Sequence, residues 1–259
     1  MGFAEGVRTS KPGNRRNVWV VAHRGASGYA PENTLAAFRK AVELGAQSIE
    51  TDLQATRDAG IVALHDPTLD RTTNGHGPVY THTFEEVRQL DAGSWYRGRA
   101  GASFVGERVP SIQEILRFGA QHDINLYLEI KTHKTWGTEN AIVAALHESG
   151  EAERVVMLSF DPNMLESVHR LDGTVMTGLL CDQPGGDLVE RALRIGARQL
   201  VPRGDLITPD LVEKAHESDL PVVAWTINEP KRMRRLIAAG VDGIMSDCPD
   251  RLVQVLKEG

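Results

Sequence analysis

The chain has 259 residues, of which 41% are hydrophobic and 25% charged, and its formal net charge is −6. This acidic balance argues against a nucleic-acid binder, which would normally carry a basic face. The sequence contains no run of 18 apolar residues, so we expect no membrane span. Two cysteines, Cys181 and Cys248, are too few for a disulfide framework, so we expect reduced thiols in a cytoplasmic protein.

The N-terminal part of the chain begins with a mildly basic stretch without an apolar run. We expect residues 1–17 to form a flexible tail, followed by a single domain over 18–259. The first apolar runs of that domain predict strands at 18–22 and 48–53. The residues between them predict a helix over 32–44.

Polar residues mark the entry to this first predicted helix. Pro31 is expected to begin the helix, with Glu32 and Asn33 favouring its N-terminus through the helix dipole. Glu32 or Asn33 is also placed to brace His23 or Arg24, which stand where the first strand ends.

The second strand is followed by a long excursion over residues 54–110. Its first apolar run, 61–66, follows after a polar turn near residues 58–60, which is too short for a parallel crossover. We therefore predict an antiparallel hairpin that returns His65 to the level of Glu50. The rest is rich in Gly, Thr and aromatic residues, with one short helix predicted over 83–90, and a long insertion of this kind is usually functional.

From residue 111 onward, short apolar runs alternate with amphipathic segments that carry helix-capping signals. The runs lie at 124–131, 154–160, 174–180, 197–202, 221–228 and 241–247. With the two early strands the total is eight, each followed by a helix, the last over 250–257. This pattern predicts an α/β fold, a (β/α)8 TIM barrel with an insertion after the second strand. A doubly wound open sheet and a broken barrel are the alternatives.

Charged side chains stand at the ends of the first three predicted barrel strands. They are His23 and Arg24, Glu50 and Asp52, and Glu129 and Lys131, and the hairpin adds His65 and Asp66. Residues two apart on a strand share a face, and barrel active sites lie at the carboxyl ends of the strands. Each residue alone has an ordinary structural explanation, but together they indicate an active site.

The three acidic residues Glu50, Asp52 and Glu129 would repel one another at a barrel mouth, and an unpaired buried carboxylate is costly. Arg24 and Lys131 supply part of the neutralising charge. An all-oxygen ligand set points to one divalent hard cation, Mg²⁺ or Ca²⁺.

The remaining histidines are expected to be less important. The four on predicted helices or helix ends are expected at the surface, namely His122, His147, His169 and His216. His133 follows the third strand and is a further candidate for the barrel mouth, while His76 and His82 in the insertion have no assigned role.

At this point the sequence resembles the glycerophosphodiester phosphodiesterase family. The motifs "AHRGASGYAPENTLAAF", "IETDLQATRDAGIVALHDPTLDRTTNG", "DAGSWY", "VPSIQEIL", "LYLEIK", "VVAWTIN" and "DGIMSDCPD" carry the resemblance, which runs from about residue 18 to 257. The family fold is a (β/α)8 barrel with an insertion after the second strand. The resemblance implies hydrolysis of small-molecule glycerophosphodiesters to glycerol 3-phosphate and an alcohol.

The resemblance also implies roles for individual residues. Three sets match the family pattern: metal ligands Glu50, Asp52 and Glu129; catalytic histidines His23 and His65; and phosphate-binding cations Arg24 and Lys131. Phe160 and Trp225 match apolar walls beside the glycerol. Cys248 departs from a position that is often aromatic in the family, but it lies beyond the strand end and is not expected to affect the chemistry.

Several alternatives stay open from the sequence. Either histidine is suited to be the general base, and the nucleophile is a glycerol hydroxyl, giving a cyclic phosphate, or a water molecule. A lysophospholipase D or phospholipase-type enzyme on the same barrel is the main alternative function. A non-catalytic phosphate-binding barrel would usually have lost one of these side chains, and a Schiff-base enzyme would need a lysine in an apolar pocket, unlike Lys131 beside Glu129.

Overall fold

The computed structural model of the chain describes residues 18–98, 103–131 and 137–258. The tail expected over 1–17 and the candidate His133 lie outside these described residues. In the described part, no helix is long and apolar enough to cross a bilayer.

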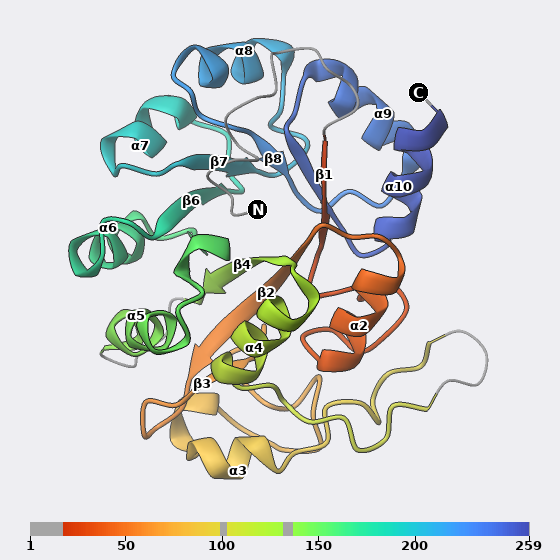
Figure 1. Cartoon of the computed structure of the whole chain (residues 1–259), viewed down its shortest axis with the longest axis vertical. Coiled ribbons are helices and arrows are strands. Elements are labelled where there is room, and N and C mark those ends of the chain that lie inside the picture. The colour runs from red at the N-terminus through yellow and green to blue at the C-terminus, as the bar shows by residue number, and fades with distance from the viewer. Residues whose placement is uncertain (1–17, 99–102, 132–136, 259) are drawn as a thin grey trace.

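Eight parallel strands form a barrel in the described residues, as the sequence predicts (Figure 1). The strands are β1 (Trp19–Ala22), β2 (Ser48–Ala55), β4 (Asn125–Ile130), β5 (Val155–Ser159), β6 (Met176–Cys181), β7 (Gln199–Pro202), β8 (Val223–Ala224) and β9 (Gly243–Ser246). They pair in the order β7-β6-β5-β4-β2-β1-β9-β8. Two isolated parallel bridges, Leu200 with Val222 and Arg203 with Trp225, join β7 to β8 and close the ring.

Helices follow the barrel strands and surround the ring on its outside (Figure 1). They are α2 (Leu35–Glu43), α4 (Ile112–His122), α5 (Thr138–Ser149), α6 (Pro162–Leu171), α7 (Leu188–Arg194), α8 (Pro209–Glu217), α9 (Pro230–Ala239) and α10 (Pro249–Glu258). The predicted caps are present. Ser111 and Glu114 form a capping box on α4, and Asp161 and Thr208 accept backbone hydrogen bonds at the starts of α6 and α8.

The start of the first helix differs from the prediction. Helix α2 begins at Leu35, and Thr34 is its N-cap, with its side chain accepting from the backbone N–H of Ala37. Asn33 has a left-handed backbone conformation with φ of +57°. A right-handed helix cannot run through that residue, so the predicted start at Pro31 is wrong.

The excursion after β2 begins with the predicted hairpin. Strand β3 (Ile61–Ala63) pairs antiparallel with β2, with Leu53 opposite Ala63 and Ala55 opposite Ile61. A 3₁₀ helix, η1 (Val79–Thr81), and a short helix, α3 (Phe84–Arg88), follow before the chain reaches α4. These segments share a small hydrophobic cluster of their own, made of Val62, Leu64, Leu69, Val79, Val87, Ala92 and Val109.

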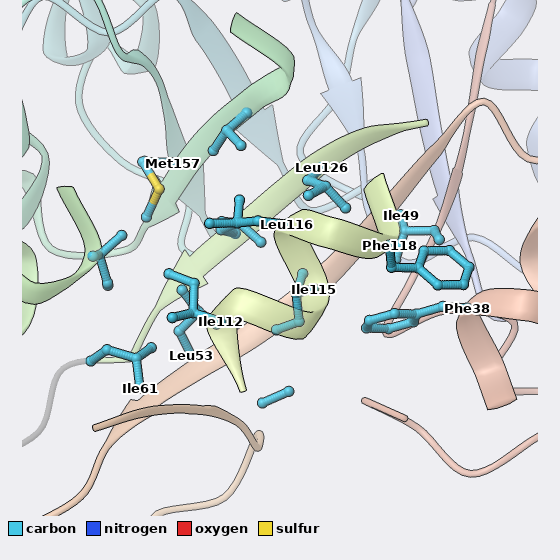
Figure 2. Close-up of a cluster of buried hydrophobic side chains, with 14 of the residues drawn as sticks. Phe38, Ile49, Leu53, Ile61, Ile112, Ile115, Leu116, Phe118, Leu126 and Met157 are labelled. Carbon is cyan, nitrogen blue, oxygen red and sulfur yellow. The ribbon is translucent and has the colours of Figure 1, made fainter. Parts of the chain in front are cut away.

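The main core lies between the barrel strands and the outer helices. Figure 2 shows Ile112, Ile115 and Leu116 of α4 in the same cluster as Leu53 of β2 and Leu126 of β4. Because side chains alternate along a strand, the neighbours of these buried residues point into the barrel. The packing therefore fixes β2 and β4 from outside and presents their acidic residues to the barrel mouth.

Candidate active site

A cavity of about 160 Å³ opens at the carboxyl ends of the barrel strands. Its lining divides into charged side chains, His23, Arg24, Glu50, His65, Glu129 and Lys131, and apolar ones, Leu158, Phe160, Leu180, Trp225 and Met245. Of the side chains singled out from the sequence for metal binding, catalysis and substrate contact, only Asp52 is missing from this lining. It lies fully buried beneath the charged wall.

The three predicted acidic ligands come together. Glu50 and Asp52 stand two residues apart on β2, and Glu129 lies beside Asp52 in the register of β2 with β4. One carboxylate oxygen from each lies within 4.8 Å of the others, and all three side chains are buried. The expected convergence of carboxylates from separate strands is therefore correct.

Two cations contact this acidic cluster. Lys131 Nζ lies 2.6 Å from Glu129 Oε1 and 2.8 Å from Asp52 Oδ1, and Arg24 Nε lies 3.2 Å from Asp52 Oδ2. The backbone N–H of Arg24 also donates to Glu50 Oε2 at 2.8 Å. Within the described residues, three carboxylates thus face two direct cationic partners.

Burial and mutual repulsion disfavour the ionised forms of two of the three carboxyl groups. Burial and the neighbouring Asp52 carboxylate raise the pKa of Glu50 to about 7, and burial together with Asp52 and Glu50 raises the pKa of Glu129 to about 8. Although burial opposes it, Lys131 and Arg24 hold the pKa of Asp52 well below its usual range.

The donor set fits a hard divalent cation. All three candidate ligands are carboxylates, the chemistry that Mg²⁺ and Ca²⁺ prefer. Asp52 Oδ1 accepts no hydrogen bond of good geometry from any described residue, although Lys131 Nζ is close. A buried acceptor of this kind is suited to coordinate an ion.

Each of the two imidazoles is anchored through Nδ1 by a carboxylate. His23 Nδ1 lies 2.7 Å from Asp247 Oδ1, and His65 Nδ1 lies 2.7 Å from Asp66 Oδ1. In both rings Nε2 is the nitrogen left for chemistry, and that of His23 lies 4.0 Å from Glu50 Oε2. In this arrangement the carboxylate fixes the tautomer and the orientation of the imidazole ring.

The surroundings move the pKa values of the two imidazoles in opposite directions. Burial lowers the pKa of His23, but the hydrogen bond with Asp247 and the charge of Glu50 outweigh it, so the net shift is upward. Burial also lowers the pKa of His65, and there the net shift remains downward. The two rings therefore sit in electrostatically different environments.

Asp247 belongs to a network whose role the sequence did not reveal. Its Oδ1 also accepts from Ser27 Oγ at 3.0 Å, and its Oδ2 accepts from Asn228 Nδ2 at 2.5 Å. Burial opposes the ionisation of Asp247, but the hydrogen bond with His23 lowers its pKa to about 2. Asp247 and Asn228 stand at predicted strand ends, and that position was the one available signal.

The two residues expected to brace the site have different partners. Glu32 Oε1 accepts from Arg24 Nη1 at 2.9 Å, so the expected contact of Glu32 with Arg24 is confirmed. Asn33 instead donates from Nδ2 to Asp52 Oδ2 at 2.8 Å and accepts from Thr51 Oγ1. The backbone N–H of Asn33 also donates to the carbonyl of Arg24 at 3.0 Å, so Asn33 links the loop after β1 to β2.

The apolar wall is built around two aromatic rings. Phe160 and Trp225 meet edge to face with their centroids 5.5 Å apart, and Trp225 Nε1 donates to the carbonyl of Val201 at 2.8 Å. Cys248 is buried and is not among the residues that line the cavity.

Residues 23–251 match the sequence model of the glycerophosphoryl diester phosphodiesterase family. A glycerophosphodiester phosphodiesterase from Caldanaerobacter subterraneus is 39% identical over 93% of this chain and 98% of that protein.

Solved structures agree with this match. A crystal structure from Silicibacter pomeroyi has a TM-score of 0.89 and 29% identity, covering 98% of this chain and 96% of that one. A phosphodiesterase from Oleispira antarctica, in complex with the product sn-glycerol-3-phosphate, has a TM-score of 0.82 and 30% identity, covering 92% and 96% of the two chains.

Proposed function

This chain belongs to the glycerophosphoryl diester phosphodiesterase family and is a phosphoric diester hydrolase, and we propose that it cleaves glycerophosphodiesters to glycerol 3-phosphate and an alcohol with one divalent cation. One observation carries the proposal: three buried carboxylates meet beside two carboxylate-anchored imidazoles at one cavity. The product found in the Oleispira antarctica relative supports the choice of product.

The cation would be held by Glu50, Asp52 and Glu129, and Mg²⁺ and Ca²⁺ both suit these oxygen ligands. When bound, it supplies a Lewis acid that offsets the negative charge of the phosphodiester. Arg24 and Lys131, which flank the ligands, bind the anionic phosphate from the protein side. Because Arg24 Nη1 donates to Glu32 and Nε lies against Asp52, Nη2 is the nitrogen of this guanidinium that would donate to a phosphate oxygen.

The two imidazoles perform general acid–base catalysis. One Nε2 removes the proton from the attacking hydroxyl, and the other protonates the leaving oxygen of the alcohol. A side chain in such a role contributes about 10²–10⁴-fold to the rate. Asp247 and Asp66 position the rings of His23 and His65 through Nδ1, so that Nε2 of each faces the substrate.

Phe160 and Trp225 form the apolar wall beside the glycerol carbons. The hydrogen bond from Trp225 Nε1 to Val201 holds the indole in place. Excluding water from this side strengthens the electrostatic interactions on the charged side of the same cavity.

The test is kinetic. His23→Ala and His65→Ala should each lower kcat for glycerophosphocholine by about 10²-fold or more, with folding intact by circular dichroism. His147→Ala is the matched control, since His147 Nε2 also pairs with an aspartate, Asp172, at 2.7 Å but is not among the residues that line the cavity. Near-full activity in either active-site variant would show that the paired-histidine scheme is wrong.

A substrate panel tests the reaction class. Wild-type protein should release glycerol 3-phosphate from glycerophosphocholine, glycerophosphoethanolamine and glycerophosphoglycerol, followed by ³¹P NMR. Lysophosphatidylcholine is the comparison substrate. Faster turnover of the lysolipid than of every water-soluble diester would favour the lysophospholipase D alternative and contradict the proposal.

A further inference from the structure

One arginine outside the cavity lining bridges two carboxylates that each hold a residue of the proposed active site. Arg71 lies in the excursion after β2, beyond strand β3. It pairs with Asp66 through Nε at 2.6 Å and Nη2 at 2.9 Å. It also pairs with Glu32 through Nη1 at 2.9 Å and Nη2 at 2.7 Å. All three guanidinium nitrogens are therefore directed at carboxylate oxygens.

The two carboxylates lead to opposite parts of the site. Asp66 Oδ1 contacts His65 Nδ1, and Glu32 Oε1 accepts from Arg24 Nη1. His65 belongs to the excursion, whereas Arg24 follows β1 of the barrel. Arg71 is thus the junction between the segment that carries one imidazole and the loop that carries the phosphate-binding guanidinium.

We propose that Arg71 is a positioning residue, which acts through Asp66 and Glu32 to fix the positions of the His65 and Arg24 side chains relative to each other. This inference rests on the proposed function. Strand β3 and the side chain of Gln54, whose Nε2 donates to the backbone carbonyls of His65 and Asp66, tie the start of the excursion to β2 rather than to the loop after β1. The position of the excursion relative to the loop after β1 therefore depends on side-chain bridges, and a planar, bidentate guanidinium is the most restrictive bridge available.

Two observations separate this role from others. Arg71 does not line the cavity, and its nitrogens already face carboxylates, which argues against direct contact with phosphate. Its side chain is 42% exposed, and exposed ion pairs contribute little to global stability. The effect of removing it should therefore fall on catalysis rather than on folding.

The chain offers a matched control. Arg203 forms the same kind of two-nitrogen pair, through Nε at 2.6 Å and Nη2 at 3.0 Å, with Asp205. Its side chain is 41% exposed, and neither partner lines the cavity. Arg203→Ala removes an equivalent surface ion pair without touching the junction.

The experiment compares Arg71→Ala, Arg71→Lys and Arg203→Ala with wild type on glycerophosphocholine. Arg71→Ala should lower kcat by about 10- to 100-fold, as removal of the partners that orient metal ligands does, and the fall in kcat should exceed any rise in KM. Arg71→Lys should recover only part of the loss, because an ammonium cannot bridge both carboxylates bidentately. Millimolar methylguanidinium should restore activity to Arg71→Ala but not change Arg203→Ala.

The outcomes are decisive in each direction. Arg71→Ala with the kcat of Arg203→Ala, or a loss of activity without any response to methylguanidinium, would overturn the inference. The ¹⁵N–¹H signals of the His65 ring provide a readout that does not depend on turnover, and they should shift in Arg71→Ala but not in Arg203→Ala. A wild type inactive on every diester, with the His65 signals still sensitive to Arg71, would refute the proposed function and leave the positioning role supported.

Discussion

Replacing Asp247 by asparagine should disable His23 while leaving the fold intact. The two side chains have nearly the same shape, so the barrel should tolerate the change. The change removes the negative charge 2.7 Å from His23 Nδ1. It also replaces a carboxylate that only accepts hydrogen bonds by an amide that both accepts and donates.

The neighbouring hydrogen bonds determine which way the new amide must face. Asn228 Oδ1 accepts from Ser246 Oγ and from the backbone N–H of residue 247, so Asn228 can present only its Nδ2 donor to the side chain there. An asparagine at 247 must therefore turn its carbonyl oxygen toward Asn228. Its NH₂ group then faces His23 Nδ1 and holds the ring in the tautomer with the proton on Nε2.

Either of the two roles proposed for His23, general base or general acid, is impaired in that state. A neutral ring with its proton on Nε2 cannot accept a proton there, and a protonated ring would place two donors against each other, which lowers the imidazole pKa. The loss is expected whether His23 is the base or the acid. We expect kcat to fall by about 10²–10⁴-fold, the range for a general acid–base group held in the wrong tautomer.

The assay is steady-state turnover of glycerophosphocholine, with thermal unfolding measured in parallel. Asp172→Asn is the control, because Asp172 pairs with His147 at the same 2.7 Å outside the cavity lining. That variant should keep wild-type kcat. An Asp247→Asn protein with kcat within about 3-fold of wild type would refute the reasoning that Asp247 sets the tautomer of His23.

Three further predictions concern the cation site and the fold. Because the pKa values of Glu50 and Glu129 are raised to about 7 and 8 in the metal-free protein, binding of a cation should release protons, and the affinity of the protein for the cation should rise with pH up to about 8. Calorimetry in buffers of different ionisation enthalpy measures this proton release. Equal heats in all buffers would contradict the prediction. Phe38→Ala should lower the free energy of unfolding by about 3–5 kcal/mol in urea titrations, since Phe38 is fully buried, and a loss below about 1 kcal/mol would be inconsistent with that packing. Gly25→Ala should reduce both stability and kcat, because Gly25 has φ of +77° and an added Cβ would lie 2.7 Å from the Cβ of Ala37; unchanged melting and turnover would disprove this.

The fold could be predicted from the sequence because its signals are local. Apolar runs mark the barrel strands, and caps such as Ser111 with Glu114 mark helix starts. The convergence of Glu50, Asp52 and Glu129 was also predictable, since parallel strands bring their carboxyl ends to one edge. The sequence alone can therefore predict that charged residues at the ends of different parallel strands lie close together in the fold.

The parts that escaped prediction depend on tertiary contacts. The pairing of His23 with Asp247 joins residues 224 positions apart and exists only because β1 and β9 are neighbours in the closed ring. The helix start failed because Asn33 takes a left-handed conformation to reach Asp52. Arg71 belongs to no periodic sequence pattern, and its contacts with both Glu32 and Asp66 form only in the folded chain.

The central claim is that the buried carboxylates and the two imidazoles form one cation-dependent hydrolytic centre. Protein stripped with a chelator and passed through a desalting column should be assayed by ³¹P NMR for release of glycerol 3-phosphate from glycerophosphocholine, before and after Mg²⁺ or Ca²⁺ is added. Stripping should lower the rate by at least about 10²-fold, and one of the two ions should restore it in wild type but not in Glu129→Gln. Full turnover by the stripped protein, or full restoration in Glu129→Gln, would contradict the central claim.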